Sequence, residues 1–137
     1  MESKLFKKLK RHTGKGFHWQ RHEDKLTPGI PDCSYGAGGI GGWVELKTYD
    51  SYPKNPKDPV NMPDIKPEQR NWMFKRGATQ GRCFWLIEIK KDWYLIGYEW
   101  SRDLGNLTRK QLKECSHAYG TGPLKGIIKV LVKEEYR

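Results

Sequence analysis

The feature that most constrains the fold is a group of five glycines between residues 36 and 42, which separates two short segments of different character. Pro31-Asp32 lies before the glycines, and the run WVELK at 43–47 follows them. Such glycines favour a tight turn between strands, so we predict a hairpin. Because side chains two residues apart on a strand share a face, Glu45 stands beside Lys47, and the hairpin brings Asp32 near both.

Two carboxylates and one ammonium group suit the binding of a divalent metal next to a phosphate. The competing interpretation of Glu45 and Lys47 is an ordinary surface ion pair, which contributes little to stability. The segment GAGGIG at 36–41 also matches the pattern G-x-G-x-x-G. That fingerprint of dinucleotide binding requires a helix directly after the glycines, whereas a strand-like run follows here. We therefore predict no nucleotide cofactor.

The 137 residues are enough for one domain with a modest core. The net charge of +10 favours an anionic partner, nucleic acid first and an acidic membrane second, over a solvated basic surface without a partner. The apolar runs are too short to span a membrane, and the N-terminus lacks the features of a signal peptide, so we expect a cytoplasmic protein. The cysteines at 33, 83 and 115 are widely spaced, which favours neither a disulfide framework nor a zinc site.

Apolar periodicity and turn residues predict the remaining elements. We expect helices at 2–11, at 67–77 ending at Gly77, and at 107–117 with Thr108 as its cap, together with strands at 17–20, 82–89, 92–100 and 126–136. The proline-rich segment at about 49–66 is either a loop that contacts substrate or a partner, or a passive linker. The resulting order of helices and strands is typical of a mixed α/β domain.

Helical spacing also predicts the direction of individual side chains. On the helix at 67–77, Gln69 shares the inward side with Trp72, Met73 and Arg76, while Arg70 and Lys75 point away. Glu2 falls on the apolar stripe of the first helix, where an unpaired carboxylate is unfavourable. Either fraying of the terminus keeps Glu2 in water, or it has a cationic or metal partner.

These residues together suggest a family. Pro31-Asp32 and Glu45-Leu46-Lys47, with Glu2 on a preceding helix and Gln69 on a following one, resemble the PD-(D/E)xK nuclease superfamily. GIPD, VELK and PEQRNW look like segments of the VRR-NUC group and of related small phage or archaeal Holliday junction resolvases. The resemblance covers residues 2–98. It implies a restriction-endonuclease-like core in a single domain over 1–137, a mixed β-sheet flanked by helices in the order αβββαβ, with the proline-rich loop at about 49–66 and an unmatched C-terminal extension at about 100–137.

The resemblance also implies a metal site and roles for its neighbours. Asp32, Glu45 and the backbone carbonyl of Leu46 would be metal ligands, and Glu2, or alternatively Glu23, would complete the set. Hard oxygen ligands favour Mg²⁺, with Mn²⁺ as a substitute. Lys47 would orient the attacking water or offset charge on the scissile phosphate. Gln69 would support that water or Lys47, although it is also explained as a polar residue in the first turn of its helix.

The expected function is therefore a metal-dependent endonuclease that hydrolyses DNA phosphodiester bonds, with a preference for branched DNA such as a Holliday junction or a flap. Branch-cutting relatives commonly act as homodimers, so we expect a dimer. Two alternatives stay open: a sequence-specific or homing-type endonuclease on the same core, and a non-catalytic basic module that stacks nucleic-acid bases on its aromatic side chains. Phosphate contacts that weaken with salt are expected from Arg21, His22, Lys25, Lys54, Lys57, Arg70, Lys75 and Arg76.

Overall fold

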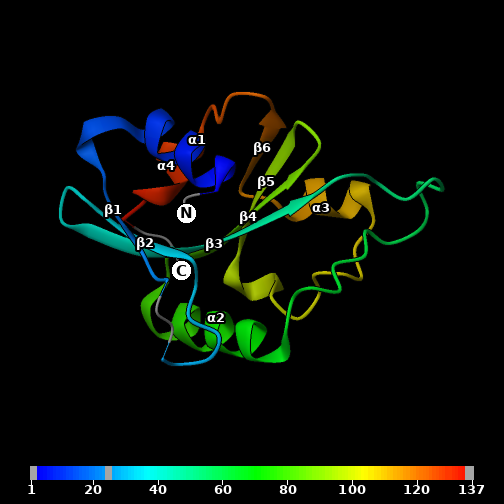
Figure 1. Ribbon diagram of the computed structural model, residues 1–137, viewed down its shortest axis with the longest axis horizontal. Coiled ribbons are helices and arrows are strands. Elements are labelled where there is room, and N and C mark those ends of the chain that lie inside the picture. Colours follow the sequence, from blue (N-terminus) through cyan, green and yellow to red (C-terminus); the bar gives the residue numbers. More distant parts are fainter. Residues whose placement is uncertain (1–2, 24–25, 135–137) are drawn as a thin grey trace.

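The computed structural model describes residues 3–23 and 26–134, which form a single six-stranded sheet with helices on both faces (Figure 1). The strands are β1 (His18–Arg21), β2 (Cys33–Ala37), β3 (Ile40–Tyr49), β4 (Cys83–Ile89), β5 (Asp92–Gly97) and β6 (Ala118–Thr121). The helices are α1 (Lys4–Thr13), α2 (Pro67–Gln80), α3 (Arg109–Cys115) and α4 (Ile127–Leu131), with 3₁₀ turns η1 (Gly14–Gly16) and η2 (Tyr98–Trp100).

The strands are ordered in space as they are in the chain, from β1 to β6. Strands β3 and β4 are parallel and are connected through α2, whereas every other neighbouring pair is antiparallel. A parallel pair needs such a crossover, while antiparallel strands can be joined by short turns. The predicted mixed α/β class and the order αβββαβ, read from α1 to β4, are confirmed.

The glycine group forms the predicted hairpin between β2 and β3. Ala37 pairs with Ile40, so Gly38 and Gly39 alone make the turn, with φ values of 57° and 81°. Positive φ at both central residues is the geometry of the tight two-residue turn that favours glycine. The strands extend further into the glycines than predicted. At Gly42 a Cβ atom would lie 2.5 Å from the Tyr35 hydroxyl, so close packing requires glycine there.

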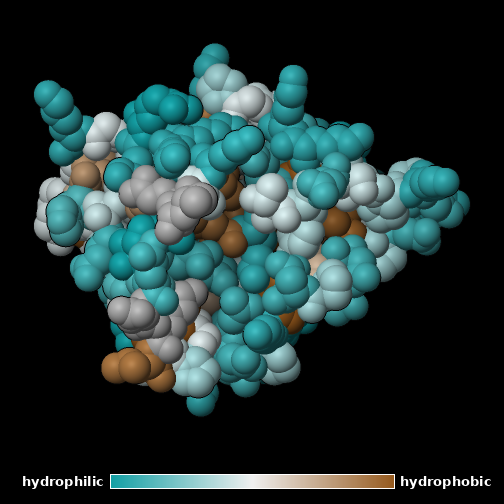
Figure 2. Space-filling model, in the orientation of Figure 1, coloured by the Kyte–Doolittle hydropathy of each residue, from teal (hydrophilic) through white to brown (hydrophobic). Residues whose placement is uncertain are grey.

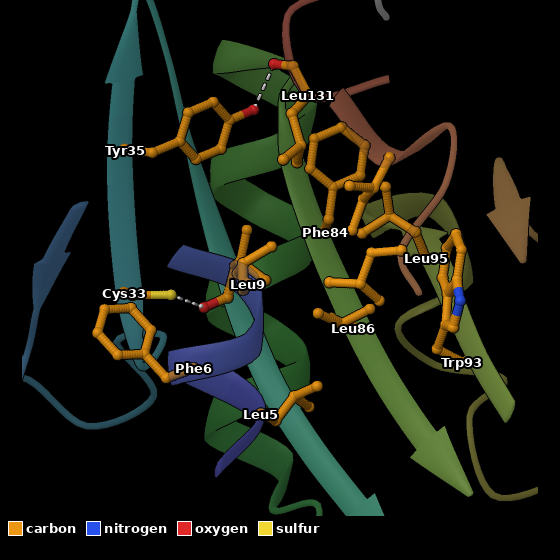
Figure 3. Close-up of a cluster of buried hydrophobic side chains, with 13 residues drawn as sticks. Leu5, Phe6, Leu9, Cys33, Tyr35, Phe84, Leu86, Trp93, Leu95 and Leu131 are labelled. Atoms are coloured by element: carbon orange, nitrogen blue, oxygen red, sulfur yellow. Dashed lines mark hydrogen bonds between the residues drawn. The ribbon is translucent and has the colours of Figure 1, made fainter. Parts of the chain in front are cut away.

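The sheet separates two hydrophobic cores, one on each face. Helices α1 and α4 cover one face and α2 covers the other (Figure 1). On the first face the α1 side chains Leu5, Phe6 and Leu9 belong to the same buried cluster as Phe84 and Leu86 of β4 (Figure 3). The intervening β4 residues pack with α2, α3 and the segment before α2. Strand β4 is thus buried on both faces, as its continuous apolar run predicts.

The proline-rich segment between β3 and α2 is anchored to the protein. Val60, Met62 and Ile65 are buried in the core beneath α2, with 2 to 6 % of their surface exposed. Nearer β3, the Tyr52 hydroxyl hydrogen-bonds to Asp92 and to the Tyr94 hydroxyl of β5. A freely solvated linker does not describe this segment, because both of its halves are held against the sheet.

Helix α2 is longer than predicted, and the role assigned to Gly77 is wrong. The helix continues to Gln80, and Gly81, with φ of 100°, ends it. Gly77 lies inside the helix where a Cβ atom would be 2.0 Å from Cγ of Tyr98. The glycine therefore allows α2 to approach η2 closely instead of terminating the helix.

The prediction of a closing strand at 126–136 is also wrong. Ile127–Leu131 is helix α4, and the last strand of the sheet is Ala118–Thr121. Ile127 and Leu131, four residues apart, are both buried in the α1-side core, as a short amphipathic helix requires. The C-terminal residues therefore share the sheet and the core with the rest of the chain.

The surface in the orientation of Figure 2 is mostly hydrophilic, with apolar side chains in small separate spots. Across the segments 3–23 and 26–134, no helix has both the length and the apolar character needed to cross a bilayer.

Candidate active site

Strand β3 presents Glu45 and Lys47 on the face that α2 covers. Val44 and Leu46 point into the α1-side core. Because side chains alternate along a strand, Glu45 and Lys47 point to the opposite face. Glu45 is only 2 % exposed, and the side chain of Lys47 is 11 % exposed. The pair is therefore not the ordinary surface ion pair considered from the sequence.

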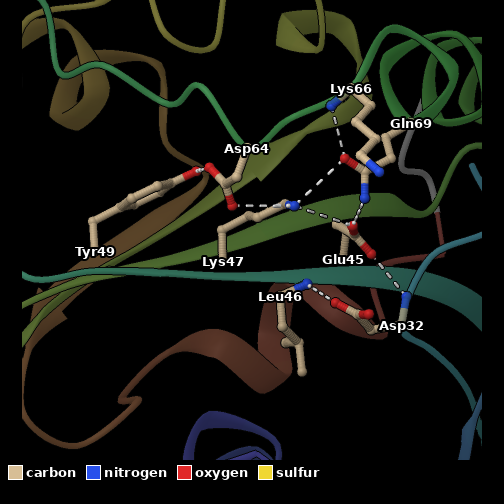
Figure 4. Close-up of polar contacts among 8 residues, drawn as sticks. All are labelled: Asp32, Glu45, Leu46, Lys47, Tyr49, Asp64, Lys66 and Gln69. Carbon is tan, nitrogen blue, oxygen red and sulfur yellow. Dashed lines mark hydrogen bonds and ion pairs between the residues drawn. The ribbon is translucent and has the colours of Figure 1, made fainter. Parts of the chain in front are cut away.

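Asp32, directly before β2, is linked to β3 in both directions (Figure 4). Its backbone N–H donates to Oε1 of Glu45 at 2.8 Å, and its Oδ2 accepts from the backbone N–H of Leu46 at 3.0 Å. The hairpin thus brings the two predicted acids together. The contact of Leu46 with Asp32 is made by its amide, and the metal-binding role of its carbonyl stays a prediction.

Gln69 in the first turn of α2 connects the helix to the charged pair. Its Nε2 donates to Oε2 of Glu45 at 2.7 Å, and its Oε1 accepts from Nζ of Lys47 at 3.4 Å. The same Oε1 accepts from the backbone N–H of Lys66 at 2.9 Å, which completes the cap of the helix. The two interpretations of Gln69 are therefore compatible, since one side chain caps the helix and contacts the buried acid.

Asp64 is a neighbour of Lys47 that sequence reasoning missed. Its Oδ2 lies 3.4 Å from Nζ of Lys47, while Oε2 of Glu45 lies 3.8 Å from the same nitrogen. Tyr49 donates to the other oxygen of Asp64 at 2.7 Å, and burial followed by this hydrogen bond raises the pKa of Tyr49 well above its ordinary range. Asp64 comes from the proline-rich segment, so no regular spacing relates it to the strand.

Asp32 and Glu45 are the residues of this arrangement that would hold a hard cation. The Asp32 N–H links the two acids by its bond to the Glu45 carboxylate, and within the described segments no group of three or more His, Cys, Asp or Glu side chains is placed to hold a metal. Mg²⁺ commonly binds through one or two carboxylates and keeps several waters, so Asp32 and Glu45 fit this ion. Glu2 lies outside the described residues, and the alternative acid Glu23 is exposed after the end of β1.

The predicted phosphate contacts occupy different environments. Lys54, Lys57 and Lys75 are exposed, and Lys25 lies outside the described residues. The guanidinium of Arg21 packs over the Phe6 ring at 4.8 Å, with Nε and Nη1 buried and without hydrogen-bond partners among the described atoms.

The predicted outward direction of Arg70 is wrong. The side chain does not point away from the protein, because its Nη1 donates to the backbone carbonyls of Ser101 and Leu104 at 2.8 and 2.6 Å. These bonds hold the segment after η2 against α2, which is a structural role. The expectation failed because helical spacing gives the direction of a side chain but does not show which segment packs beside it.

The last two predicted contacts lie beside the acids. His22 approaches Ser34 through its Nε2 at 2.9 Å and packs against the Trp43 ring, and its backbone N–H donates to the carbonyl of Asp32. Arg76 lies over the rings of Trp43 and Trp72. Both residues therefore belong to the same face of the sheet as Glu45.

Comparisons of the sequence with known proteins find no match. No family model matches the chain, and no curated protein matches it. Among solved structures, the fold is similar to that of Hjc, a Holliday junction resolvase from the archaeal hyperthermophile Archaeoglobus fulgidus. The TM-score is 0.43 and the sequence identity 15 %, and the match covers 69 % of each chain.

Proposed function

We propose that this protein is a divalent-metal-dependent endonuclease that hydrolyses DNA phosphodiester bonds. The observation that supports the proposal is a buried carboxylate, that of Glu45, which is contacted by Asp32 from just before β2, by Lys47 of β3 and by Gln69 of α2. A buried carboxylate is unfavourable unless it is hydrogen-bonded, and Glu45 accepts hydrogen bonds from Asp32 and Gln69. The net charge of +10 suits an anionic polymer as substrate.

Asp32 and Glu45 would hold Mg²⁺ or Mn²⁺, which when bound would stabilise the negative charge that develops on the phosphoryl oxygens. Lys47 would bring its ammonium group to the scissile phosphate or to the attacking water. Asp64 and Gln69 restrict the position of that ammonium group, since both contact Nζ. The Gln69 amide also keeps Glu45 oriented toward Asp32.

Branched DNA is the substrate class that we propose, with a homodimer as the active assembly. The support is the resemblance of GIPD, VELK and PEQRNW to junction-cutting nucleases. A dimer would place two sites on opposite strands of a junction. Sedimentation of the purified protein at micromolar concentration tests the dimer, and a monomer at all concentrations contradicts it.

Cleavage assays test the activity itself. Labelled four-way junction, flap, duplex and single-stranded DNA are incubated with the protein in Mg²⁺, in Mn²⁺ and in EDTA. We expect metal-dependent cutting, fastest on the branched substrates, and a loss of at least about 100-fold in Asp32→Ala and Lys47→Ala. Cutting of one defined duplex sequence, with junctions ignored, would instead select the sequence-specific alternative.

A charged pair on the other face of the sheet is a matched control. Lys8 of α1 and Glu88 of β4 form a partly buried ion pair of 3.2 Å on the opposite face from Gln69. Glu88→Gln should leave cutting within about twofold of wild type, because it removes a carboxylate of similar setting away from the site. If DNA is bound but never cut with any divalent ion, the protein is a binding module and the proposal fails.

A further inference from the structure

A compact group of aromatic and cationic side chains lies beside the candidate active site. The guanidinium carbon of Arg76 is 4.7 Å from the Trp72 ring centroid and 5.3 Å from that of Trp43, and the two indoles meet edge to face at 4.9 Å. Oε1 of Gln80 accepts from the Trp43 indole N–H at 3.3 Å and from Nη1 of Arg76 at 3.5 Å. We call these four residues the indole–arginine cluster.

The cluster continues the row of site residues along two elements. Trp43 precedes Glu45 by two positions on β3, so their side chains leave the same face of the strand. Trp72 and Arg76 follow Gln69 by three and seven positions on α2, which is the spacing of one helical face. The guanidinium therefore lies next to the site, because Arg76 shares a helix face with Gln69 and packs on Trp43, which shares a strand face with Glu45.

The positive charge of Arg76 is not matched by an acid. No carboxylate among residues 3–23 and 26–134 lies within 4.0 Å of its nitrogens, whereas Arg109 pairs with Asp92 at 3.2 Å and Lys47 pairs with Asp64 at 3.4 Å. Ring faces and one amide oxygen hold the guanidinium in place without neutralising it. A positioned, half-buried guanidinium without a carboxylate is suited to a phosphate group, which it can bind through two parallel N–H donors.

We infer that the indole–arginine cluster is a phosphate-binding subsite, which holds the DNA phosphate next to the one that is cleaved. Arg76 donates to the phosphate oxygens, and the indoles of Trp43 and Trp72 act as positioning groups that reduce the freedom of the guanidinium before DNA arrives. The inference rests on the proposed function, because it takes DNA as the ligand and the acids as the point of cleavage.

The test measures DNA binding without cleavage. Binding of a fluorescein-labelled four-way junction is followed by anisotropy in EDTA over a range of salt concentrations, for wild type, Arg76→Gln and the control Lys129→Gln. Lys129 is exposed on α4, on the other face of the sheet. Its substitution by Gln removes the same charge as Arg76→Gln. We expect Arg76→Gln to bind about five- to tenfold more weakly at low salt and to reduce the slope of log K against log salt by about 0.9, whereas Lys129→Gln stays within about twofold.

Variants of Trp72 separate a positioned guanidinium from a general charge effect. Trp72→Phe keeps an aromatic face and should bind within about twofold of wild type, while Trp72→Leu keeps an apolar side chain without that face and should lose most of the affinity that Arg76→Gln loses. The double variant Trp72→Leu with Arg76→Gln should bind no more weakly than Arg76→Gln alone. Thermal unfolding of each variant checks that it is folded at the assay temperature.

Two outcomes overturn the subsite: Arg76→Gln binds like Lys129→Gln, or the effects of Trp72→Leu and Arg76→Gln are additive. Failure of the proposed function is a different result. A protein that cuts the junction in Mg²⁺ while Arg76→Gln binds normally has the activity without the subsite. If the protein never cuts DNA but its binding depends on Arg76 as described, the phosphate-binding subsite is supported and the proposed nuclease activity is contradicted.

Discussion

At the scale of single residues, the hydrogen bonds of Gln69 can be compared with those of Gln111. Gln69 caps α2 and donates to Glu45, whereas Gln111 caps α3 in the same way, with its Oε1 2.9 Å from the N–H of Thr108, in an exposed setting. Gln69→Leu should lower DNA cleavage about 10- to 100-fold and destabilise the fold by about 1 to 3 kcal/mol, because a buried carboxylate loses a donor. Cleavage rates and urea unfolding measure the two effects.

Gln111→Leu is the control for the loss of a capping side chain alone. It should leave cleavage within about twofold and cost about 0.5 to 1 kcal/mol. Equal effects of the two substitutions on cleavage would show that Gln69 acts only as a cap, and would remove it from the site.

Gly77 is a residue at which two opposing effects can be ranked. Alanine in the interior of a helix is favoured over glycine by about 1 kcal/mol. At Gly77, however, the added Cβ would lie 2.0 Å from Cγ and 2.4 Å from Cβ of Tyr98, atoms that cannot move away without a shift of η2. Overpacking of this kind costs about 1 to 3 kcal/mol or more, so Gly77→Ala should lower the free energy of unfolding.

Urea denaturation checks this prediction against Gly16→Ala, a position with no atom within 4 Å of the added Cβ. The control should change the free energy of unfolding by less than about 0.5 kcal/mol. A stabilised Gly77→Ala protein would mean that α2 and η2 are packed less closely than described.

At the scale of elements, the hydroxyl group of Tyr52 attaches the β3 end of the proline-rich segment to β5. Burial and the hydrogen bonds to Asp92 and Tyr94 raise the pKa of Tyr52 well above its ordinary range, so it stays a donor at any working pH. Burial alone would raise the pKa of Asp92, but the hydrogen bonds from Tyr52 and Thr121 and the charge of Arg109 outweigh it and hold that pKa below the usual value. The attachment is therefore strongest when Asp92 is ionised.

Tyr52→Phe should consequently destabilise the protein by about 1 to 2 kcal/mol at pH 7, and by less below about pH 4. The sign follows from the lowered pKa of Asp92, because the stabilisation is present above the carboxyl's ordinary pKa and is lost as the pH falls through the folded value. Urea unfolding at pH 7 and at pH 3 measures it. Tyr119→Phe, which alters an exposed tyrosine of β6, should have little effect at either pH.

Local patterns within an element were predictable from the sequence, whereas contacts between distant segments were not. The hairpin at Gly38 and Gly39 and the continuous apolar run of β4 are local patterns, and both were predictable. The glycine hairpin predicted that Asp32 meets Glu45. Helical spacing gave only the inward side of Gln69, and the family resemblance added it to the site. Asp64 and the inward turn of Arg70 were not, since each depends on a distant segment that packs beside it. Helix α4 was missed because the short run IIKVL fits a strand as well as a helix.

At the scale of the whole molecule, the two cores share their strands. Phe84 and Leu86 point to the α1 side and Trp85 and Ile87 to the α2 side, so neither core can open without disturbing β4. The hydrogen bond from the Leu46 amide to Asp32 also links the α2-side site to a residue whose side chain packs in the α1-side core. Loss of packing on the α1 side should therefore unfold the α2 side in the same step.

Leu131→Ala tests this cooperativity from helix α4, which covers the opposite face of the sheet from α2. Leu131 is fully buried on α4, and its carbonyl, which accepts the Tyr35 hydroxyl at 2.6 Å, is retained in the variant. The substitution should lower the free energy of unfolding by about 2 to 5 kcal/mol, while Lys129→Ala on the exposed side of α4 should change it by less than about 0.5 kcal/mol. Tryptophan fluorescence and far-UV circular dichroism should report one coincident urea transition with an unchanged m value. Two separate transitions would mean that the C-terminal helix closes a subdomain that unfolds by itself, and that the α2-side site does not depend on it.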